Sequence, residues 1–142
     1  MPFTILVVED EELTMQIMSV SLRHRGHHVL EAVSPQQGLT LARVERPDII
    51  LMDMNFKNAT FDGIEAIRRL KADPRTEHIP VVAHTASVMD YTERVVRAAG
   101  ASGFIRKPFR RQELLDVIEA AIGRPLAVPS AVLPTLRRQL PV

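Results

Sequence analysis

Five short apolar runs alternate with longer amphipathic stretches along this chain. The runs cover residues 3–8, 28–32, 48–52, 81–85 and 104–105. The stretches that follow them have the length and the spacing of apolar residues typical of helices. Strands separated by helix-length segments predict crossover units, in which neighbouring strands run parallel and helices cover the sheet. The sequence therefore predicts an α/β fold built on a five-stranded parallel sheet.

Five helices are predicted between and after these runs. They span residues 12–25, 35–46, 63–72, 90–99 and 111–122. Ser34 and Pro35 suit the N-cap and first turn of the second helix, and Pro47 stops it. In the first helix, Leu13, Ile17 and Val20 recur at the spacing of one helical face. Three further apolar residues widen that face: Met15, Met18 and Leu22.

Composition limits the class of protein. The 142 residues are 46% hydrophobic, which suits one domain with one substantial core. The absence of cysteine excludes disulfides and thiolate metal sites, and the first residues lack the pattern of a secretory signal. The apolar runs are too short to span a bilayer. We therefore expect a cytoplasmic protein without membrane contact.

Charge gives no sign of nucleic-acid binding. Residues 1–71 carry 8 basic and 10 acidic side chains, a net of −2, and residues 72–142 carry 10 and 7, a net of +3. This asymmetry is too small for a nucleic-acid patch, and the basic residues are scattered along predicted helices. A solvated surface is the better interpretation.

The last 20 residues differ from the rest of the chain. They contain four of the ten prolines, so we predict one domain over residues 1–122 and a Pro-rich tail over residues 123–142, without an effector domain. The tail has more apolar residues than a disordered terminus usually carries. A docking or dimerising arm and a frayed terminus both remain open.

Chemically distinct side chains follow four of the apolar runs, where each predicted strand ends. They are Glu9 and Asp10, Asp53, Thr85, and Lys107. Because ligands of open parallel sheets bind outside the carboxyl ends of the strands, we expect these side chains to lie together. Taken singly, each has an ordinary explanation as a cap, a turn former or a surface residue. Their joint placement indicates a functional site.

Phosphoryl transfer onto a carboxylate would use all of these groups. Crowded carboxylates repel one another unless a divalent cation neutralises them, and Mg²⁺ (or Mn²⁺) prefers oxygen ligands. We expect Asp10, and Glu9 through a water, to hold that cation. Asp53 ends the central run and is the expected nucleophile, since a carboxylate can form an acyl phosphate. Lys107 would pair with phosphoryl oxygens, and Thr85 would donate a hydrogen bond.

Four ordered motifs carry a resemblance to a known family. ILVVEDEE, IILMDMN, PVVAHTA and FIRKPF occur in this order, and over roughly residues 3–122 the chain resembles the response-regulator receiver domain family. The resemblance implies a flavodoxin-like sheet of strand order 2-1-3-4-5 and phosphorylation by a partner histidine kinase. It also implies the metal ligands Glu9, Asp10, Asp53 and the backbone carbonyl of Asn55. The implied catalytic residues are Asp53 as phosphoacceptor, Thr85 and Lys107, with Thr85 and Phe104 as the switch.

Three features of the chain bear on that resemblance. Lys57 stands where the family usually has a proline, and Gly63 comes about two residues late, so the loop after Asp53 should be longer. Asn58 in this loop is suited to a turn. Phe104 stands where many members have tyrosine, so the switch would depend on packing without a phenol hydrogen bond. The resemblance further predicts a cis peptide bond between Lys107 and Pro108.

The resemblance predicts a stand-alone receiver that signals instead of acting as an enzyme, apart from assisting its own phosphotransfer and dephosphorylation. It would relay the phosphoryl group to a histidine phosphotransfer protein or contact a target. A homodimer could form through the tail or the fourth and fifth helices. The alternative is a phosphorylation-independent binding module. A flavin-binding protein is disfavoured, because the acidic first loop would repel a cofactor phosphate.

The five histidines include one cluster, at residues 24, 27 and 28. Gly26 interrupts the helix there and adjacent strand residues point in opposite directions, so a shared metal site is not expected. His84 precedes Thr85 and is predicted to be a packed strand residue.

Overall fold

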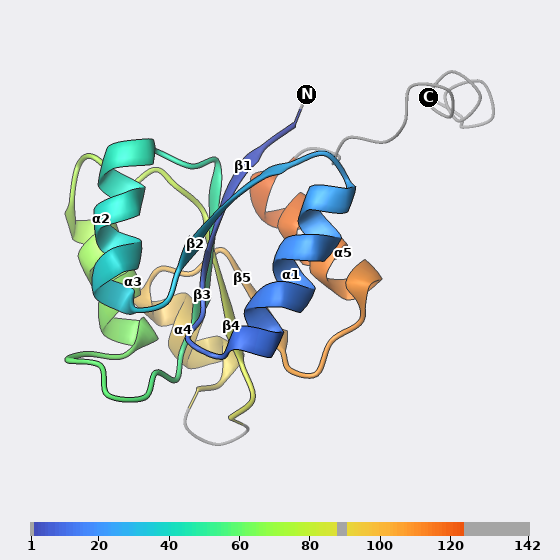
Figure 1. The fold of residues 1–142 in the computed structure, drawn as a ribbon. Coiled ribbons are helices and arrows are strands. Elements are labelled where there is room, and N and C mark those ends of the chain that lie inside the picture. Colours follow the sequence, from blue (N-terminus) through green and yellow to red (C-terminus); the bar gives the residue numbers. More distant parts are fainter. Residues whose placement is uncertain (1, 88–90, 124–142) are drawn as a thin grey trace.

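Strands and helices alternate along the chain in the computed structural model, which describes residues 2–87 and 91–123 (Figure 1). The strands are β1 (Thr4–Val8), β2 (His28–Ala32), β3 (Ile49–Asp53), β4 (Val81–Thr85) and β5 (Gly103–Arg106). The helices are α1 (Glu12–His24), α2 (Pro35–Glu45), α3 (Gly63–Ala72), α4 (Glu93–Ala99) and α5 (Arg111–Ile122). No helix in these two ranges is long and apolar enough to cross a membrane. Nearly all of the predicted tail lies outside the described residues.

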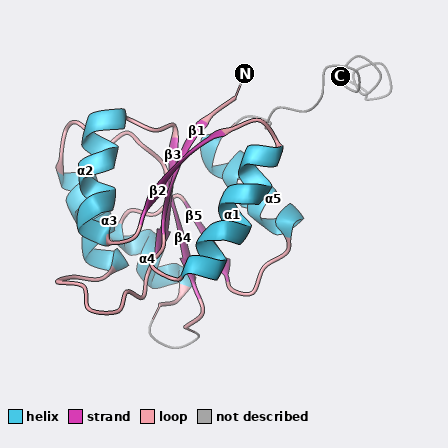
Figure 2. Ribbon diagram, in the orientation of Figure 1, coloured by secondary structure: helices cyan, strands magenta, loops and turns pink. Residues whose placement is uncertain are grey.

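All five strands of the sheet are parallel, in the order β2-β1-β3-β4-β5. This confirms the predicted flavodoxin-like arrangement. Helices α1 and α5 cover one face of the sheet, and α2, α3 and α4 cover the other (Figure 2). Because connections between neighbouring parallel strands must cross over, each strand is followed by a helix that packs back onto the sheet.

Strict alternation along the strands divides the core into two layers. In β1, Ile5 and Val7 point toward α1 and α5, whereas Leu6 and Val8 point toward α2 and α3. Gly38 lets α2 approach β1, since a Cβ at this position would lie 2.9 Å from a methyl carbon of Val8. The three inner strands, β1, β3 and β4, are buried on both faces, which explains why they read as continuous apolar runs.

The apolar face predicted for α1 is only partly buried. Leu13, Ile17 and Val20 are 64%, 55% and 64% exposed. The residues of α1 that pack on the sheet are Met15, Met18, Ser19 and Leu22. The two apolar stripes are about half a turn apart around the helix, and both have the helical period. Periodicity alone could not decide which stripe faces the sheet, so α1 keeps an apolar stripe on its outer surface.

Candidate active site

The register of the sheet brings three polar residues into one row. Two of them, Glu9 and Asp53, were predicted as site residues, and His84 was not. Asp53 of β3 pairs with His84 of β4, and Glu9 follows the pair Val8 and Met52 on β1 and β3. Residues two apart point to the same face of a sheet, so Glu9, Asp53 and His84 share the face covered by α1 and α5. The row lies at the carboxyl ends of the strands.

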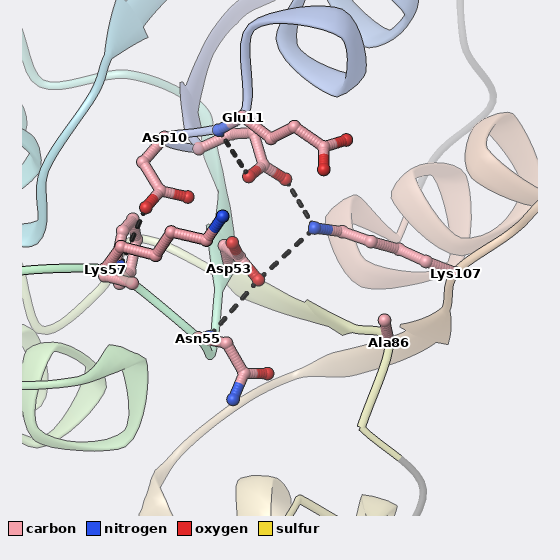
Figure 3. Close-up of a pocket in the computed structure, with 9 residues that line it drawn as sticks. Asp10, Glu11, Asp53, Asn55, Lys57, Ala86 and Lys107 are labelled. Carbon is pink, nitrogen blue, oxygen red and sulfur yellow. Dashed lines mark hydrogen bonds and ion pairs between the residues drawn. The ribbon is translucent and has the colours of Figure 1, made fainter.

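The Lys107 ammonium lies between the two carboxylates of this row (Figure 3). Its Nζ is 2.5 Å from Glu9 Oε1 and 3.4 Å from Asp53 Oδ1. Glu9 and Asp53 are almost fully buried, while Lys107 is 18% exposed and reaches them from the loop after β5. A single positive charge therefore faces two buried negative ones.

Burial and crowding change the proton affinities in this cluster. Burial, followed by the negative charge of Glu9, raises the pKa of Asp53 to about 7 against the opposing effects of Lys107 and the Asn55 amide. Burial alone would lower the pKa of Lys107, but hydrogen bonds and charges from Glu9 and Asp53 outweigh it and raise that pKa. The carboxylates are therefore short of positive charge, as expected of a cation site.

His84 lies directly beside this cluster and is fully buried. Its Nδ1 is 3.7 Å from Glu9 Oε1. Burial and then the charge of Lys107 lower the pKa of His84 to about 3, and the backbone of Leu51 acts in the opposite direction without outweighing them. The imidazole is therefore neutral near pH 7, and its contact with Glu9 is not an ion pair. The prediction of a packed strand residue is correct, but its place next to the carboxylates was missed.

The opposite wall of the site comes from the loops after β1 and β3 (Figure 3). Lys57 N donates to Asp10 Oδ2 at 2.8 Å, and Asn55 N donates to Asp53 Oδ1 at 3.3 Å. Together these walls enclose an open cavity of about 290 Å³. It is lined by Glu9, Asp10, Glu11, Asp53, Asn55, Phe56, Lys57, Ala86 and Lys107. Sequence reasoning missed the lining roles of Glu11, Phe56, Lys57 and Ala86, because loop residues follow no periodic pattern.

Thr85 lies next to this cavity without lining it. Its Oγ1 donates to Asn55 Oδ1 at 2.9 Å and accepts from Ser87 N at 3.0 Å. The side chain points to the opposite face of the sheet from Asp53, one residue beyond His84. Thr85 is therefore linked to the carboxylate through Asn55.

Phe104 does not line the cavity. It is partly buried against the core layer formed by α2, α3 and α4. The guanidinium of Arg106 lies 5.1 Å from the centre of its ring and donates to the Ser87 carbonyl at 2.9 Å. Phe104 and the loop after Thr85 thus share a neighbour.

The loop between β3 and α3 is held by specific contacts. Asn58 adopts a left-handed backbone with φ of 56°, as its predicted turn requires. Asp62 caps α3 by accepting from Glu65 N at 3.0 Å, and it also accepts from the Tyr91 hydroxyl at 2.8 Å. Gly63 has no room for a side chain, since a Cβ would lie 2.1 Å from the Asp53 carbonyl oxygen. The predicted cis bond between Lys107 and Pro108 is present.

The donor set of the cavity suits a hard divalent cation. Glu9, Asp10 and Asp53 offer carboxylate oxygens, and the Asn55 backbone offers a carbonyl oxygen, which are ligands that Mg²⁺ accepts. The raised pKa of Asp53 indicates that positive charge would be favourable there.

His27, from the histidine cluster, has a structural role, because its Nδ1 accepts a hydrogen bond from Phe3 N at 3.0 Å.

Sequence comparisons agree with this geometry. The model of the response regulator receiver domain matches residues 5–119. The polar-differentiation response regulator DivK of Brucella anthropi is 33% identical over 123 residues, which are 87% of this chain and 98% of that protein. DivK of Brucella ovis is 32% identical over 120 residues, with coverage of 84% and 96%.

Solved structures of similar fold include two with more than 25% identity. A putative response regulator from Chloroflexus aurantiacus J-10-fl has a TM-score of 0.80 and 27% identity, over 87% of this chain and all of that one. The receiver domain of sensor histidine kinase PA1611 from Pseudomonas aeruginosa PAO1 has a TM-score of 0.78 and 29% identity, over 87% and 99%. That structure carries a magnesium ion in its active-site cleft.

Proposed function

This chain belongs to the response regulator receiver domain family, and we propose that its Asp53 accepts a phosphoryl group from a histidine kinase. The observation that carries the proposal is the position of Asp53. It is a buried carboxylate at the carboxyl end of the central strand, within 3.4 Å of the Lys107 ammonium and beside Glu9. Membership implies the kinase as a partner, and the acidic cavity supplies the acceptor.

The reaction transfers one phosphoryl group from a histidine side chain of the kinase to the Asp53 carboxylate. An oxygen of the Asp53 carboxylate attacks phosphorus in a phosphohistidine, an O–P bond forms and the N–P bond breaks. The bonding electron pair remains on the imidazole nitrogen, which then takes a proton from solvent. We propose that Glu9, Asp10, Asp53 and the Asn55 carbonyl hold Mg²⁺ (or Mn²⁺), which neutralises the phosphoryl charge. With a cation bound, Asp53 would be ionised at neutral pH.

Lys107 and Thr85 complete the proposed machinery. The Lys107 ammonium is already within ion-pair distance of Asp53. After phosphorylation it would pair with an oxygen of the phosphoryl group on Asp53. Thr85 would exchange its bond to Asn55 for a bond to the phosphoryl group. Because Arg106 contacts both the Phe104 ring and the Ser87 carbonyl, movement of the loop that follows Thr85 would be transmitted to the ring through Arg106.

A groove next to the cavity fits a helix that carries the phosphohistidine. It has a volume of about 370 Å³ and is lined by Glu11, Thr14, Ile17, Met18, Ala86, Lys107, Pro108 and Phe109. It is continuous with the exposed stripe of α1, through Ile17. An exposed apolar surface that borders an active site is typical of a docking surface. We propose that the histidine kinase docks here.

We propose further that residues 1–122 act as a single receiver domain in the cytoplasm, with residues 123–142 as a separate tail. The phosphorylated domain would pass its phosphoryl group to a histidine phosphotransfer protein or contact a target protein. Homodimerisation through the tail or through α4 and α5 is a second route for output. Beyond its own phosphorylation and dephosphorylation, no substrate turnover is proposed.

Phosphorylation with acetyl phosphate tests the proposal. We expect one phosphoryl group per chain by intact mass spectrometry, dependent on Mg²⁺, and none for Asp53→Asn. Asp116→Asn, an exposed acid on α5, is the matched control and should be phosphorylated normally. Incorporation into Asp53→Asn equal to that of the control would overturn the assignment.

The exposed stripe of α1 also suits the alternative, a binding module that does not need phosphorylation. Partner affinity measured with and without acetyl phosphate separates the two. A partner that binds the phosphorylated chain and Asp53→Asn equally well would favour the binding module.

A further inference from the structure

His84 is a buried polar side chain without a structural task of its own. Neither of its ring nitrogens has a partner in full hydrogen-bond geometry among the described residues, and the Leu51 backbone acts on the ring only weakly, without outweighing burial. Buried polar groups are nearly always hydrogen-bonded, because an unmet partner costs free energy. An aliphatic residue would fill this position in β4 without that cost. An unpartnered imidazole therefore requires an explanation.

The neighbourhood of His84 is that of a metal ligand. One ligand atom each from Glu9, Asp53 and His84 can be chosen so that all three lie within 4.8 Å of one another. The contact between His84 Nδ1 and Glu9 Oε1, at 3.7 Å, is close to the ligand spacing of about 3.3 Å in a tetrahedral zinc site. An oxygen of Asp53 lies within 4.8 Å of both of these atoms, so it can serve as the third ligand after a local adjustment.

We propose that Glu9, Asp53 and His84 form a second cation site, which selects a borderline ion such as Zn²⁺. Zn²⁺ accepts imidazole nitrogen and carboxylate oxygen as ligands, and three protein ligands with a water as the fourth give it tetrahedral coordination. Mg²⁺ demands octahedral oxygen coordination and has no use for the imidazole. The two sites share Glu9 and Asp53 but lie on different sides of them. Asp10 is on the hard-cation side and His84 on the buried side.

Lys107 occupies the place that the second cation would take. Its ammonium bridges Glu9 and Asp53, and its side chain is long and 18% exposed, so it can move into the cavity. Zn²⁺ would then replace one positive charge by two. Bound Zn²⁺ would keep Lys107 away from Asp53 and so remove the ammonium that would pair with the incoming phosphoryl oxygens. The binding step stands by itself, whereas this inhibition rests on the proposed phosphoacceptor role.

Metal titrations of the full chain test the proposal. We expect stoichiometric binding of Zn²⁺ by calorimetry, and visible absorption bands of tetrahedral coordination when Co²⁺ is used as the probe. His84→Leu should weaken Zn²⁺ by about 100-fold or more, since even indirect partners of a metal typically contribute 10–100-fold. Mg²⁺ affinity should change less than about 2-fold, because the imidazole is not its ligand. His78→Gln, an exposed histidine, is the matched control and should bind Zn²⁺ normally.

Two further readouts keep the outcome decisive. In the wild-type chain, the Nδ1 resonance of His84 should shift when Zn²⁺ is added, and this requires no variant. Zn²⁺ should also reduce the rate of phosphorylation by acetyl phosphate in the wild type but not in His84→Leu. For each protein, the rate is expressed relative to its own rate without zinc. Equal Zn²⁺ affinity in His84→Leu and wild type, or an unshifted His84 resonance, would overturn the site. If no variant is phosphorylated at all, the proposed function fails while the Co²⁺ spectra still decide this site.

Discussion

Two consecutive rows of side chains on the same face of the sheet have opposite properties. The first row, from paired residues of β1, β3, β4 and β5, is Val7, Leu51, Val82 and Gly103. The second row, two residues further along each strand, is Glu9, Asp53, His84 and Ile105. Both rows are buried. The first contains no polar side chain, whereas the second has three ionisable ones.

The comparison separates what stabilises this domain from what the site does. Burial of the first row contributes roughly 25 cal/mol for each Å² of apolar surface. Burial of the second row removes charges and dipoles from water, with Lys107 as the main compensation, and it shifts the pKa values of Asp53 and His84 toward the neutral forms. The same strands thus stabilise the fold through the first row and position ionisable groups in the second. The second row lowers stability, because its polar groups are removed from water.

Leu51→Ala should produce the largest loss of stability, since it empties part of the apolar row. Leu51 is fully buried between α1, α5 and the neighbouring strands. We expect a loss of about 3–4 kcal/mol in the free energy of unfolding, measured by urea denaturation. A loss below about 1 kcal/mol would mean that the apolar row does not carry the stability assigned to it.

Asp53→Asn should do the reverse and stabilise the domain at alkaline pH. The pKa of Asp53 is raised from its ordinary 3.8 to about 7, so the folded state holds a proton that the unfolded state releases. The carboxyl is neutral in both states below pH 4, and ionisation costs stability as pH rises from 4 to 7. In metal-free buffer at pH 8, we expect the variant to be more stable by up to about 4 kcal/mol, and the gain to shrink toward pH 4. Saturating Mg²⁺ should reduce the difference by stabilising the wild type.

His84 should have the opposite pH dependence. Its pKa is lowered from 6.5 to about 3, so the unfolded state binds a proton that the folded state refuses. Stability is complete above pH 6.5 and is lost as pH falls toward 3, by about 2 kcal/mol at pH 5. Between pH 5 and pH 7.5, the loss of stability caused by ionisation of Asp53 and the gain caused by deprotonation of His84 in the unfolded state nearly cancel in the wild type.

Single variants should separate these two slopes. Asp53→Asn should lose stability as pH falls from 7.5 to 5, and His84→Leu should gain stability over the same interval. Thermal unfolding of the wild type and both variants at several pH values checks this. Parallel curves for the three proteins would show that neither group titrates as the row predicts.

The comparison also explains how far sequence reasoning could go. Alternating apolar runs and helices predicted the sheet, because period and length suffice for that. Polar residues directly after the runs placed Glu9, Asp53 and Lys107 together, because parallel strands end at one edge. The row formed with His84 depends on strand register, which no local pattern specifies. For a related reason the sequence could not tell which apolar stripe of α1 faces the sheet, since both stripes have the same period.

Ile17→Ala should have the smallest effect on stability. It tests whether the stability contributed by an aliphatic residue such as Leu51 depends on its burial and not on its hydrophobicity alone. Ile17 is an aliphatic residue like Leu51, but it is 55% exposed on the outer stripe of α1. We expect a change within about 0.5 kcal/mol in the same urea titration. A loss comparable with that of Leu51→Ala would mean that the outer stripe is covered in solution.

Ile17→Asp extends this test from stability to docking. The variant should take a phosphoryl group from acetyl phosphate at the wild-type rate, because Ile17 does not line the carboxylate cavity. Transfer from a phosphorylated histidine kinase should fall by about tenfold or more, since a charge would be buried in the groove that holds the partner helix. A proportional loss with both donors would place the defect in the chemistry of Asp53 instead of in docking. The outer stripe would then be explained neither by stability nor by kinase binding.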